Sequence, residues 1–262
     1  MTRIYQVDSF TDRPFTGNPA GVCILEGPAD DNWMQNVARE MAVSETAFLY
    51  PEKGGYCLRW FAPGAEVDLC GHATLASAHI LWEKGFAEKD EKLFFFTKSG
   101  TLAASLNDGW IELDFPVLDE EEEETYEELA EALDVEPVYV GRNAFDYLVE
   151  ISSEDSLRKL EPDLARIAAI TARGVCVTAV SSSPEYDFVS RLFAPAIGIP
   201  EDPVTGSTHC CLGPYWMKKL GKDTFYAYQA SQRGGYLKVQ VRDDRVLICG
   251  KAVTVFAGEI LD

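Results

Sequence analysis

An internal repeat is the sequence feature that most constrains how this chain can fold. The first half contains RWFAP at Arg59–Pro63 and then GHAT at Gly71–Thr74. The second half contains RLFAP at Arg191–Pro195 and then GSTH at Gly206–His209. In both copies an apolar helical pattern follows the glycine. A strand, a loop, a glycine and a helix in the same order twice predict two lobes of one architecture.

The two predicted lobes are residues 1–118 and 119–262, joined near Glu120, with the last strand free to cross back to the first lobe. Each lobe mixes strands with helices, so the predicted class is α+β. The repeated helices are expected at Thr74–Lys84 and Ser207–Leu220. Pro214 should kink or split the second one, because proline lacks the N–H that a helix interior needs.

Charge and composition exclude several classes of function. The formal net charge is −20 over 262 residues, which disfavours partners such as nucleic acid or an anionic membrane. No apolar run reaches the ~18 residues of a membrane span, and the N-terminus lacks the apolar core of a signal peptide. Seven scattered cysteines without a CxxC pair predict reduced thiols, and three histidines disfavour a histidine-rich zinc site. We therefore expect a cytoplasmic protein that acts on a small molecule.

The repeated loops place glycine and small polar residues at two helix starts. The first turn of a helix has free N–H groups and the positive end of the helix dipole. Glycine lets a ligand approach the backbone closely. If the lobes face each other, the two helix starts form a pocket for carboxylate groups. The alternative is ordinary capping of the two helices by Thr74 and Ser207.

Titratable residues flank both loops. Cys70 and His72 lie in the first loop, and Glu201 and Asp202 precede the second glycine. Glu45, in SETAF, stands at the start of an apolar strand, where burial should raise its pKa toward the range of a general base. The alternative for Glu45 is a solvent-facing residue. Three kinds of site remain open at this point: a metal site, a thiol nucleophile and a proton-transfer pocket.

Five stretches carry a resemblance to a known family, in order over nearly the whole chain. They are FTGNPAGVC (Phe15–Cys23), SETAF (Ser44–Phe48), LRWFAPGAEVDLCGHATLASAHIL (Leu58–Leu81), FVSRLFAPAIGIPEDPVTGSTHC (Phe188–Cys210) and QRGGYLKVQV (Gln232–Val241). The chain resembles the PhzF family, the phenazine biosynthesis-like isomerases with the diaminopimelate epimerase-like fold. The resemblance implies two pseudo-symmetric lobes, each a mixed sheet around a central helix, and a substrate cleft between them. It also implies a homodimer, with no metal and no organic cofactor.

The resemblance assigns roles residue by residue. Glu45 matches the catalytic glutamate that moves a proton from one carbon to another. His72 matches the histidine that orients the substrate, and Asp202 matches the aspartate that faces this histidine. The substrate-binding residues that it implies are Asn18, Gly71, Gly206, Ser207 and Thr208.

Cys70 departs from a simple transfer of the family pattern. It stands where the related two-cysteine epimerases and racemases carry one catalytic cysteine, but Asp202 occupies the position of their second.

The leading hypothesis is a cofactor-independent isomerase that shifts a proton on a small carboxylated metabolite. An epimerase using Cys70 with Asp202 is the first alternative, because a helix start would lower the pKa of the thiol. A catalytically silent binding protein is the second. A cysteine hydrolase is disfavoured, because Cys70 and His72 lie only two residues apart on a loop, a poor geometry for a thiol–imidazole pair.

Overall fold

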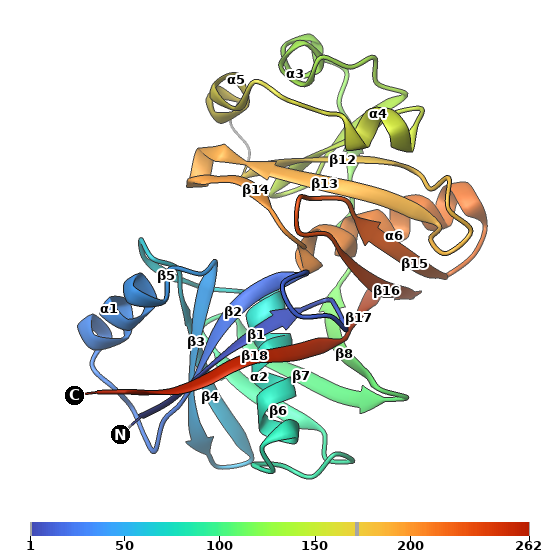
Figure 1. The fold of residues 1–262 in the computed structure, drawn as a ribbon. Helices are drawn as coiled ribbons and strands as arrows, with labels where there is room; N and C mark the ends of the chain where they lie inside the picture. Colours follow the sequence, from blue (N-terminus) through green and yellow to red (C-terminus); the bar gives the residue numbers. More distant parts are fainter. Residues whose placement is uncertain (1, 171–172, 262) are drawn as a thin grey trace. The chain divides into compact units, whose positions relative to one another are not determined.

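The computed structural model describes residues 2–170 and 173–261 (Figure 1). Contacts divide the chain into two compact units. Unit 1 is Met1–Asp114 together with Cys249–Asp262, and unit 2 is Phe115–Ile248. The lobe boundary expected between residues 118 and 119 lies close to this division, and the last strand belongs to unit 1.

Unit 1 is a mixed sheet built around one helix. The first strand pairs antiparallel with the second and with the last strand of the chain, and the second is parallel to the third. The third is antiparallel to the fourth, which is parallel to the sixth, and the sixth, seventh and eighth form an antiparallel run. The elements are β1 (Thr2–Ser9), β2 (Asn18–Ile24), α1 (Asp31–Met41), β3 (Glu45–Glu52), β4 (Gly55–Phe61), β5 (Glu66–Val67), α2 (Gly71–Glu83), β6 (Leu93–Thr97), β7 (Gly100–Asn107), β8 (Trp110–Pro116) and β18 (Ala252–Ile260).

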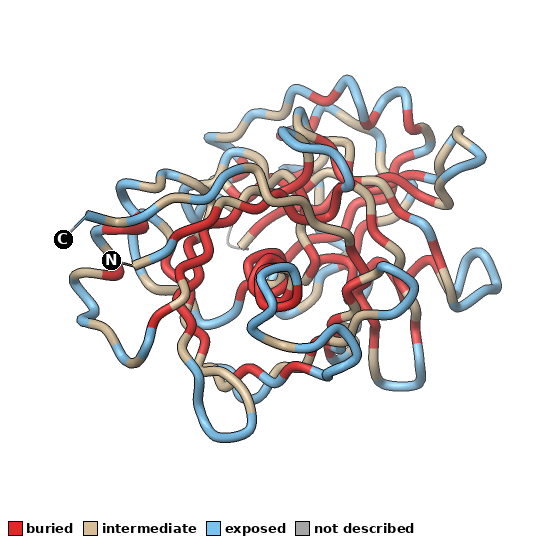
Figure 2. Tube along the Cα trace, turned by 60° about the horizontal axis from the view of Figure 1, so that its bottom comes forward, coloured by how far each residue is buried: buried red, intermediate tan, exposed pale blue. Residues whose placement is uncertain are grey.

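Helix α2 is the centre of unit 1. Ten of its side chains are buried, and they lie on all sides of the helix rather than along one stripe. A helix that is apolar all round requires neighbours all round. Figure 2 shows this helix end-on and buried, with strands around it. Ala73, Ala76 and Ala78 are fully buried, and their small size lets the strands lie close to the helix.

Unit 2 repeats the strand pairing of unit 1. Its strands follow the same succession of antiparallel, parallel, antiparallel, parallel and antiparallel pairs from β10 to β16. The duplication predicted from the sequence is therefore present at the level of hydrogen-bonded strands. The elements are β9 (Glu121–Glu122), α3 (Glu127–Leu133), β10 (Tyr139–Arg142), β11 (Asp146–Glu150), α4 (Glu154–Arg158), α5 (Leu164–Ala169), β12 (Gly174–Val180), β13 (Phe188–Ala194), η1 (Pro195–Ile197), β14 (Ile199–Asp202), α6 (Gly206–Leu220), β15 (Thr224–Gln229), β16 (Gly235–Arg242) and β17 (Arg245–Gly250).

The repeated arginine of unit 1 has a structural role. Residues two apart on a strand share a face, so Arg59 lies beside Phe61 on β4. The guanidinium carbon is 5.1 Å from the centre of the Phe61 ring, and Arg59 donates to both carboxylate oxygens of Glu66 at 2.7 and 2.9 Å. A planar guanidinium and a carboxylate match in this geometry.

The same arrangement recurs in unit 2. Arg191 lies over Phe193, with 4.8 Å between the guanidinium carbon and the ring centre, and donates to Glu201 at 2.7 and 3.1 Å. The RxFAP motif thus attaches a short strand to each sheet. Glu201, a titratable candidate in the sequence, is engaged in this pair rather than in the site.

The helix predictions need two corrections. Helix α2 begins at Gly71, earlier than the expected Thr74. Helix α6 runs unbroken through Pro214, so a split is wrong. Pro214 leaves the Cys210 carbonyl without its helical donor, and the backbone N–H of Leu118 donates to that carbonyl at 3.1 Å instead. No helix among the described residues has the length and apolar character needed to cross a bilayer.

Candidate active site

The start of α2 brings together three of the residues selected from the sequence. Cys70 is the residue before the helix, in an extended conformation with φ −146° and ψ 108°. The side chain of such a residue turns back over the first helical turn. Glu45 begins β3, which packs against α2 and lies parallel to β2. The sheet and the helix start therefore place one carboxylate next to one thiol and one imidazole.

The three side chains form a compact buried cluster. Glu45 Oε2 lies 3.1 Å from His72 Nε2, and Cys70 Sγ lies 3.5 Å from His72 Nδ1. The side chains of His72 and Glu45 are only 8% and 12% exposed. The expectation that Cys70 and His72 are poorly placed for contact is wrong, because the extended residue before the helix directs its thiol onto the ring.

The pKa of Glu45 moves in the direction opposite to the one expected. Burial raises it, as the sequence suggested. The hydrogen bond and charge of His72, together with a hydrogen bond from Cys70, lower the pKa more, and the net shift is below the ordinary value. Glu45 is therefore ionised at neutral pH and can accept a proton.

The thiol of Cys70 also departs from expectation. Burial and the negative charge of Glu45 raise the pKa of Cys70 to about 11, although a helix start alone would lower it. Burial on its own lowers the pKa of His72, but its contacts with Cys70 and Glu45 raise that pKa well above the ordinary value. Near neutral pH the cluster is thus a carboxylate and a neutral thiol, with an imidazole whose contact with Glu45 favours its protonated form.

These shifts predict how the pair contributes to stability at different pH values. The raised pKa of His72 adds stability below its ordinary 6.5 and loses it as pH rises through the folded-state value. The lowered pKa of Glu45 adds stability above 4.5 and loses it as pH falls through the folded-state value. Both contributions are complete between pH 4.5 and 6.5. His72→Asn should therefore cost most there, about 3 kcal/mol, and less at pH 9.

Urea unfolding at pH 5.5 and pH 9 measures this difference. His79→Asn on the same helix is the control, because burial lowers the pKa of His79 and no loss of its contribution is expected at high pH. An equal cost of His72→Asn at both pH values would contradict the raised pKa.

Asn18 is tied to the same region through the turn that precedes it. Gly17 has φ +68°, and a Cβ there would lie 2.2 Å from the Ser9 carbonyl oxygen, so the turn requires glycine. Asn18 is fully buried and accepts a hydrogen bond from Ser44 Oγ at 3.2 Å. Ser44 directly precedes Glu45, so Asn18 orders the backbone that carries the carboxylate.

Unit 2 has its own group of predicted residues at the start of α6. Thr205 Oγ1 donates to the carboxylate of Asp202. Gln229 accepts from the Thr205 N–H at 2.9 Å and donates to the Asp202 carbonyl at 2.8 Å. The residues that precede the two helices are Cys70 and Thr205, and neither makes an ordinary side-chain capping hydrogen bond, although the Ala73 backbone contacts the Cys70 thiol. Capping by Thr74 and Ser207 is therefore not observed, and the first turns keep N–H groups for a ligand.

Arg173 and Asp146 also hold this helix start, and the sequence did not identify either of them as a candidate. Arg173 donates to both oxygens of Asp146 at 3.0 and 2.6 Å and to Ser207 Oγ at 3.3 Å. Thr208 Oγ1 is 3.5 Å from Asp146 Oδ2. Because Ser207 Oγ accepts from Arg173, its own hydroxyl proton is free to point elsewhere.

The strand register of the structure, which the sequence repeat alone does not give, relates Arg173 to the position of Glu45. Phe48 pairs with Arg59 in unit 1, and Val177 pairs with Arg191 in unit 2. Glu45 lies three residues before Phe48 in unit 1. Gly174 lies three residues before Val177 in unit 2, and Arg173 directly precedes Gly174. The duplication therefore left an acid at this position in one unit and an arginine beside it in the other.

The cluster in unit 1 is also a possible set of metal ligands by its chemistry. Glu45, Cys70 and His72 offer oxygen, sulfur and nitrogen atoms within 4.8 Å of one another. Three such ligands and an open position are typical of catalytic zinc. A thiol with a pKa of about 11 must lose its proton before it can bind. A metal at this cluster would therefore have to displace the proton of Cys70.

Comparisons with known proteins cover nearly the whole chain. The model of the phenazine biosynthesis-like protein family, PhzC-PhzF, matches residues 7–258. An uncharacterized isomerase of Halalkalibacterium halodurans is 57% identical over 99% of this chain and 98% of its own. The crystal structure of a PhzF family protein from Enterococcus faecalis has a TM-score of 0.95 at 41% identity, with 99% of each chain covered.

A more distant structure shows how far the fold extends. A probable proline racemase from Agrobacterium radiobacter has a TM-score of 0.63 at 11% identity, covering all of this chain and 93% of its own. At this identity the likeness concerns the fold alone. The predicted α+β, epimerase-like architecture is confirmed.

Proposed function

Because this chain belongs to the phenazine biosynthesis-like (PhzF) family, we propose that it is an isomerase that moves a proton between two carbons of a small carboxylated metabolite. Three of its relatives carry the name uncharacterized isomerase. The observation that carries the proposal is the buried contact between Glu45 and His72 at the start of α2. It joins a base to a hydrogen-bond donor in one small volume.

The proposed reaction uses one carboxylate in two directions. Glu45 takes the proton from a weakly acidic carbon, and the electron pair of that C–H bond moves into the adjacent double bond or carboxyl group. The glutamic acid then returns the proton to a second carbon, and the double bond shifts. His72 donates to the substrate oxygen on which negative charge develops.

Substrate binding would also adjust the base. His72 lowers the pKa of Glu45 through a hydrogen bond and a charge. A substrate oxygen that takes this hydrogen bond removes part of that effect, while exclusion of water raises the pKa further. The carboxylate of Glu45 would therefore become a stronger base when the substrate is bound.

Residues of both units complete the proposal. Asp202, in unit 2, is proposed as a further catalytic acid, and its orientation by Thr205 and Gln229 supports a fixed role. The first turns of α2 and α6 supply backbone donors for a carboxylate. The proposed substrate-binding residues are Asn18, Gly71, Gly206, Ser207 and Thr208.

Solvent deuterium incorporation tests the reaction. The protein is incubated in heavy water with a panel of carboxylated metabolites, and carbon-bound protons are followed by NMR. Incorporation at one carbon together with a shifted double bond supports the isomerase. If no compound isomerises but some bind, the catalytically silent binding protein is favoured.

Cys70→Ala separates the isomerase from the epimerase. We expect the variant to keep the exchange rate within about threefold, because a thiol of pKa about 11 is a poor base at neutral pH. The same assay measures the rate, and chiral chromatography measures the configuration of the product. A loss of about 100-fold or more with an inverted stereocentre in the wild-type product would favour the epimerase using Cys70 and Asp202.

Chelation addresses the metal alternative. We expect dialysis against EDTA to leave the exchange rate unchanged, because the proposed steps need only Glu45, His72 and backbone donors. Loss of the rate and its return with Zn²⁺ would contradict cofactor independence.

A further inference from the structure

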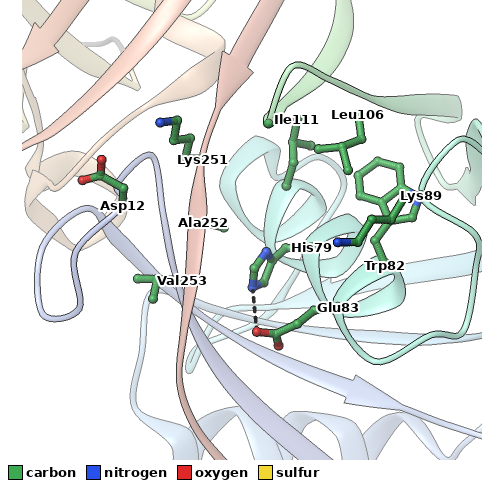
Figure 3. A pocket seen from close by; sticks show the side chains of 11 residues that line it. Asp12, His79, Trp82, Glu83, Lys89, Leu106, Ile111, Lys251, Ala252 and Val253 are labelled. Carbon is green, nitrogen blue, oxygen red and sulfur yellow. Dashed lines mark ion pairs between the residues drawn. The ribbon is translucent and has the colours of Figure 1, made fainter.

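We propose that unit 1 carries a second small-molecule site, at the far end of α2, which binds a small carboxylate with an apolar or aromatic body. The site is a cavity of about 330 Å³ lined by α2, the loops after α2 and β1, the β7–β8 hairpin and β18. Small-molecule sites commonly occupy about 300–1,000 Å³. Figure 3 shows the side chains that line it.

The cavity is separate from the cluster of Glu45, Cys70 and His72. His79 and Glu83 line it, and His79 lies seven residues after His72 on α2. At 1.5 Å per residue the two histidines are about 10 Å apart along the helix axis. None of the residues proposed for the isomerase reaction lines the cavity.

One wall of the cavity is apolar. Trp82, Leu106, Ile111 and Val253 contribute side chains from the helix, the hairpin and β18. Trp82 is fixed in place, because its indole N–H donates to the Glu91 carbonyl at 3.3 Å. An aromatic ring held by a hydrogen bond is a rigid surface for the body of a ligand.

The acidic groups at the cavity already have partners. Glu83 accepts from Thr254 Oγ1 at 2.7 Å and pairs with Lys84 at 2.9 Å. Asp12 lies 4.0 Å from Arg13. Because the Thr254 proton points to Glu83, His79 Nε2 must donate to Thr254 Oγ1 at 3.1 Å, which engages that side of the ring.

The two lysines at the cavity are different. In the part of the chain that the structure describes, neither Lys89 nor Lys251 has a carboxylate at ion-pair distance. Lys251 Nζ lies 5.4 Å from the centre of the Trp110 ring, and its carbonyl accepts from the backbone of the β1–β2 loop. The carboxylates of Asp12 and Glu83 equal these two lysines in number, but each carboxylate has a cationic neighbour outside the cavity, Arg13 or Lys84. A ligand carboxylate would pair with one of these two ammonium groups, and the apolar wall would take the rest of the ligand.

Histidine NMR tests the site without any knowledge of the reaction. The chain has three histidines, so the ring signals of His72, His79 and His209 can be assigned with single variants. Sodium benzoate is titrated into the protein, with benzamide as a neutral analogue of the same shape and inorganic phosphate as an anion without an apolar body. We expect the His79 signal to shift with saturation by benzoate, and benzamide and phosphate to bind at least about tenfold more weakly.

Variants show whether the lysines hold the ligand. Lys89→Gln with Lys251→Gln should weaken benzoate binding at least about tenfold. Lys53→Gln with Lys92→Gln removes the same charge outside the cavity and should leave binding unchanged. Glu45→Gln should also leave the His79 titration unchanged, so a protein without isomerase activity still reports on this site.

Two results would overturn the proposal. One is a benzoate titration in which His72 shifts and His79 does not, which would place the ligand at the isomerase site. The other is equal weakening by the two lysine pairs, or equal binding of benzoate and benzamide, either of which would show that the cavity does not recognise the charge. The ring signal of the fully buried His209 serves as a check on folding in every variant.

Discussion

Glu45→Gln is expected to lower the rate of deuterium exchange by about 10²- to 10⁴-fold, the range that a positioned general base contributes. Glutamine has the size of glutamate and can still accept a hydrogen bond from His72, but it cannot accept a proton. The buried contact at 3.1 Å makes this substitution a change of chemistry rather than of shape. The measurement is the exchange rate of the best compound of the panel, at saturating concentration.

Glu52→Gln is the matched control, because Glu52 ends the same strand and is exposed. It should retain the wild-type rate. Glu45→Gln should also remove the acid limb of the pH profile of kcat/KM, which reports the free protein and which we expect below pH 4.5 because the pKa of Glu45 is lowered there. A variant with at least half of the wild-type rate would exclude Glu45 as the base.

The architecture was the part of the structure most accessible from the sequence. Repeated motifs at Arg59 and Arg191 predicted two similar units, and both arginines make the same pair with a glutamate and the same contact with a phenylalanine. Such motifs are visible because their parts lie close together in the chain. Within the acidic run Asp119–Glu124, Glu121 and Glu122 form a short exposed strand against β10. That pairing depends on a distant segment and leaves no local pattern.

The sequence could nominate candidate site residues but not their electrostatics. The resemblance selected Glu45 and His72, which lie in contact. The direction of the pKa shift of Glu45 could not be predicted, because it is the difference between burial and two neighbouring groups whose distances the sequence does not give. The contact of Cys70 with His72 depends on an extended backbone at a single residue before α2. Arg173 and Asp146 meet across a parallel strand pair, and neither belongs to a motif.

The pair of Arg173 and Asp146 leads to the second large prediction. Asp146 is only 2% exposed, and the guanidinium of Arg173 donates a hydrogen bond to each of its carboxylate oxygens. Arg173→Met should lower the free energy of unfolding by about 3 kcal/mol, because it leaves a buried carboxylate with Thr208 as its remaining described side-chain contact. Urea unfolding at pH 7, followed by circular dichroism, measures the loss.

A double-mutant cycle distinguishes an unpaired charge from lost packing. Asp146→Asn in the Arg173→Met background removes the charge that the first substitution left behind, so the double variant should be less destabilised than the sum of the two single variants. Arg166→Met is the control in the same unit, because Arg166 pairs with Glu131 in an exposed position and should change stability little. Equal losses for Arg173→Met and Arg166→Met would mean that Asp146 is solvated when its partner is removed. The start of α6, with Ser207 and Thr208, would then not depend on the pair for its order.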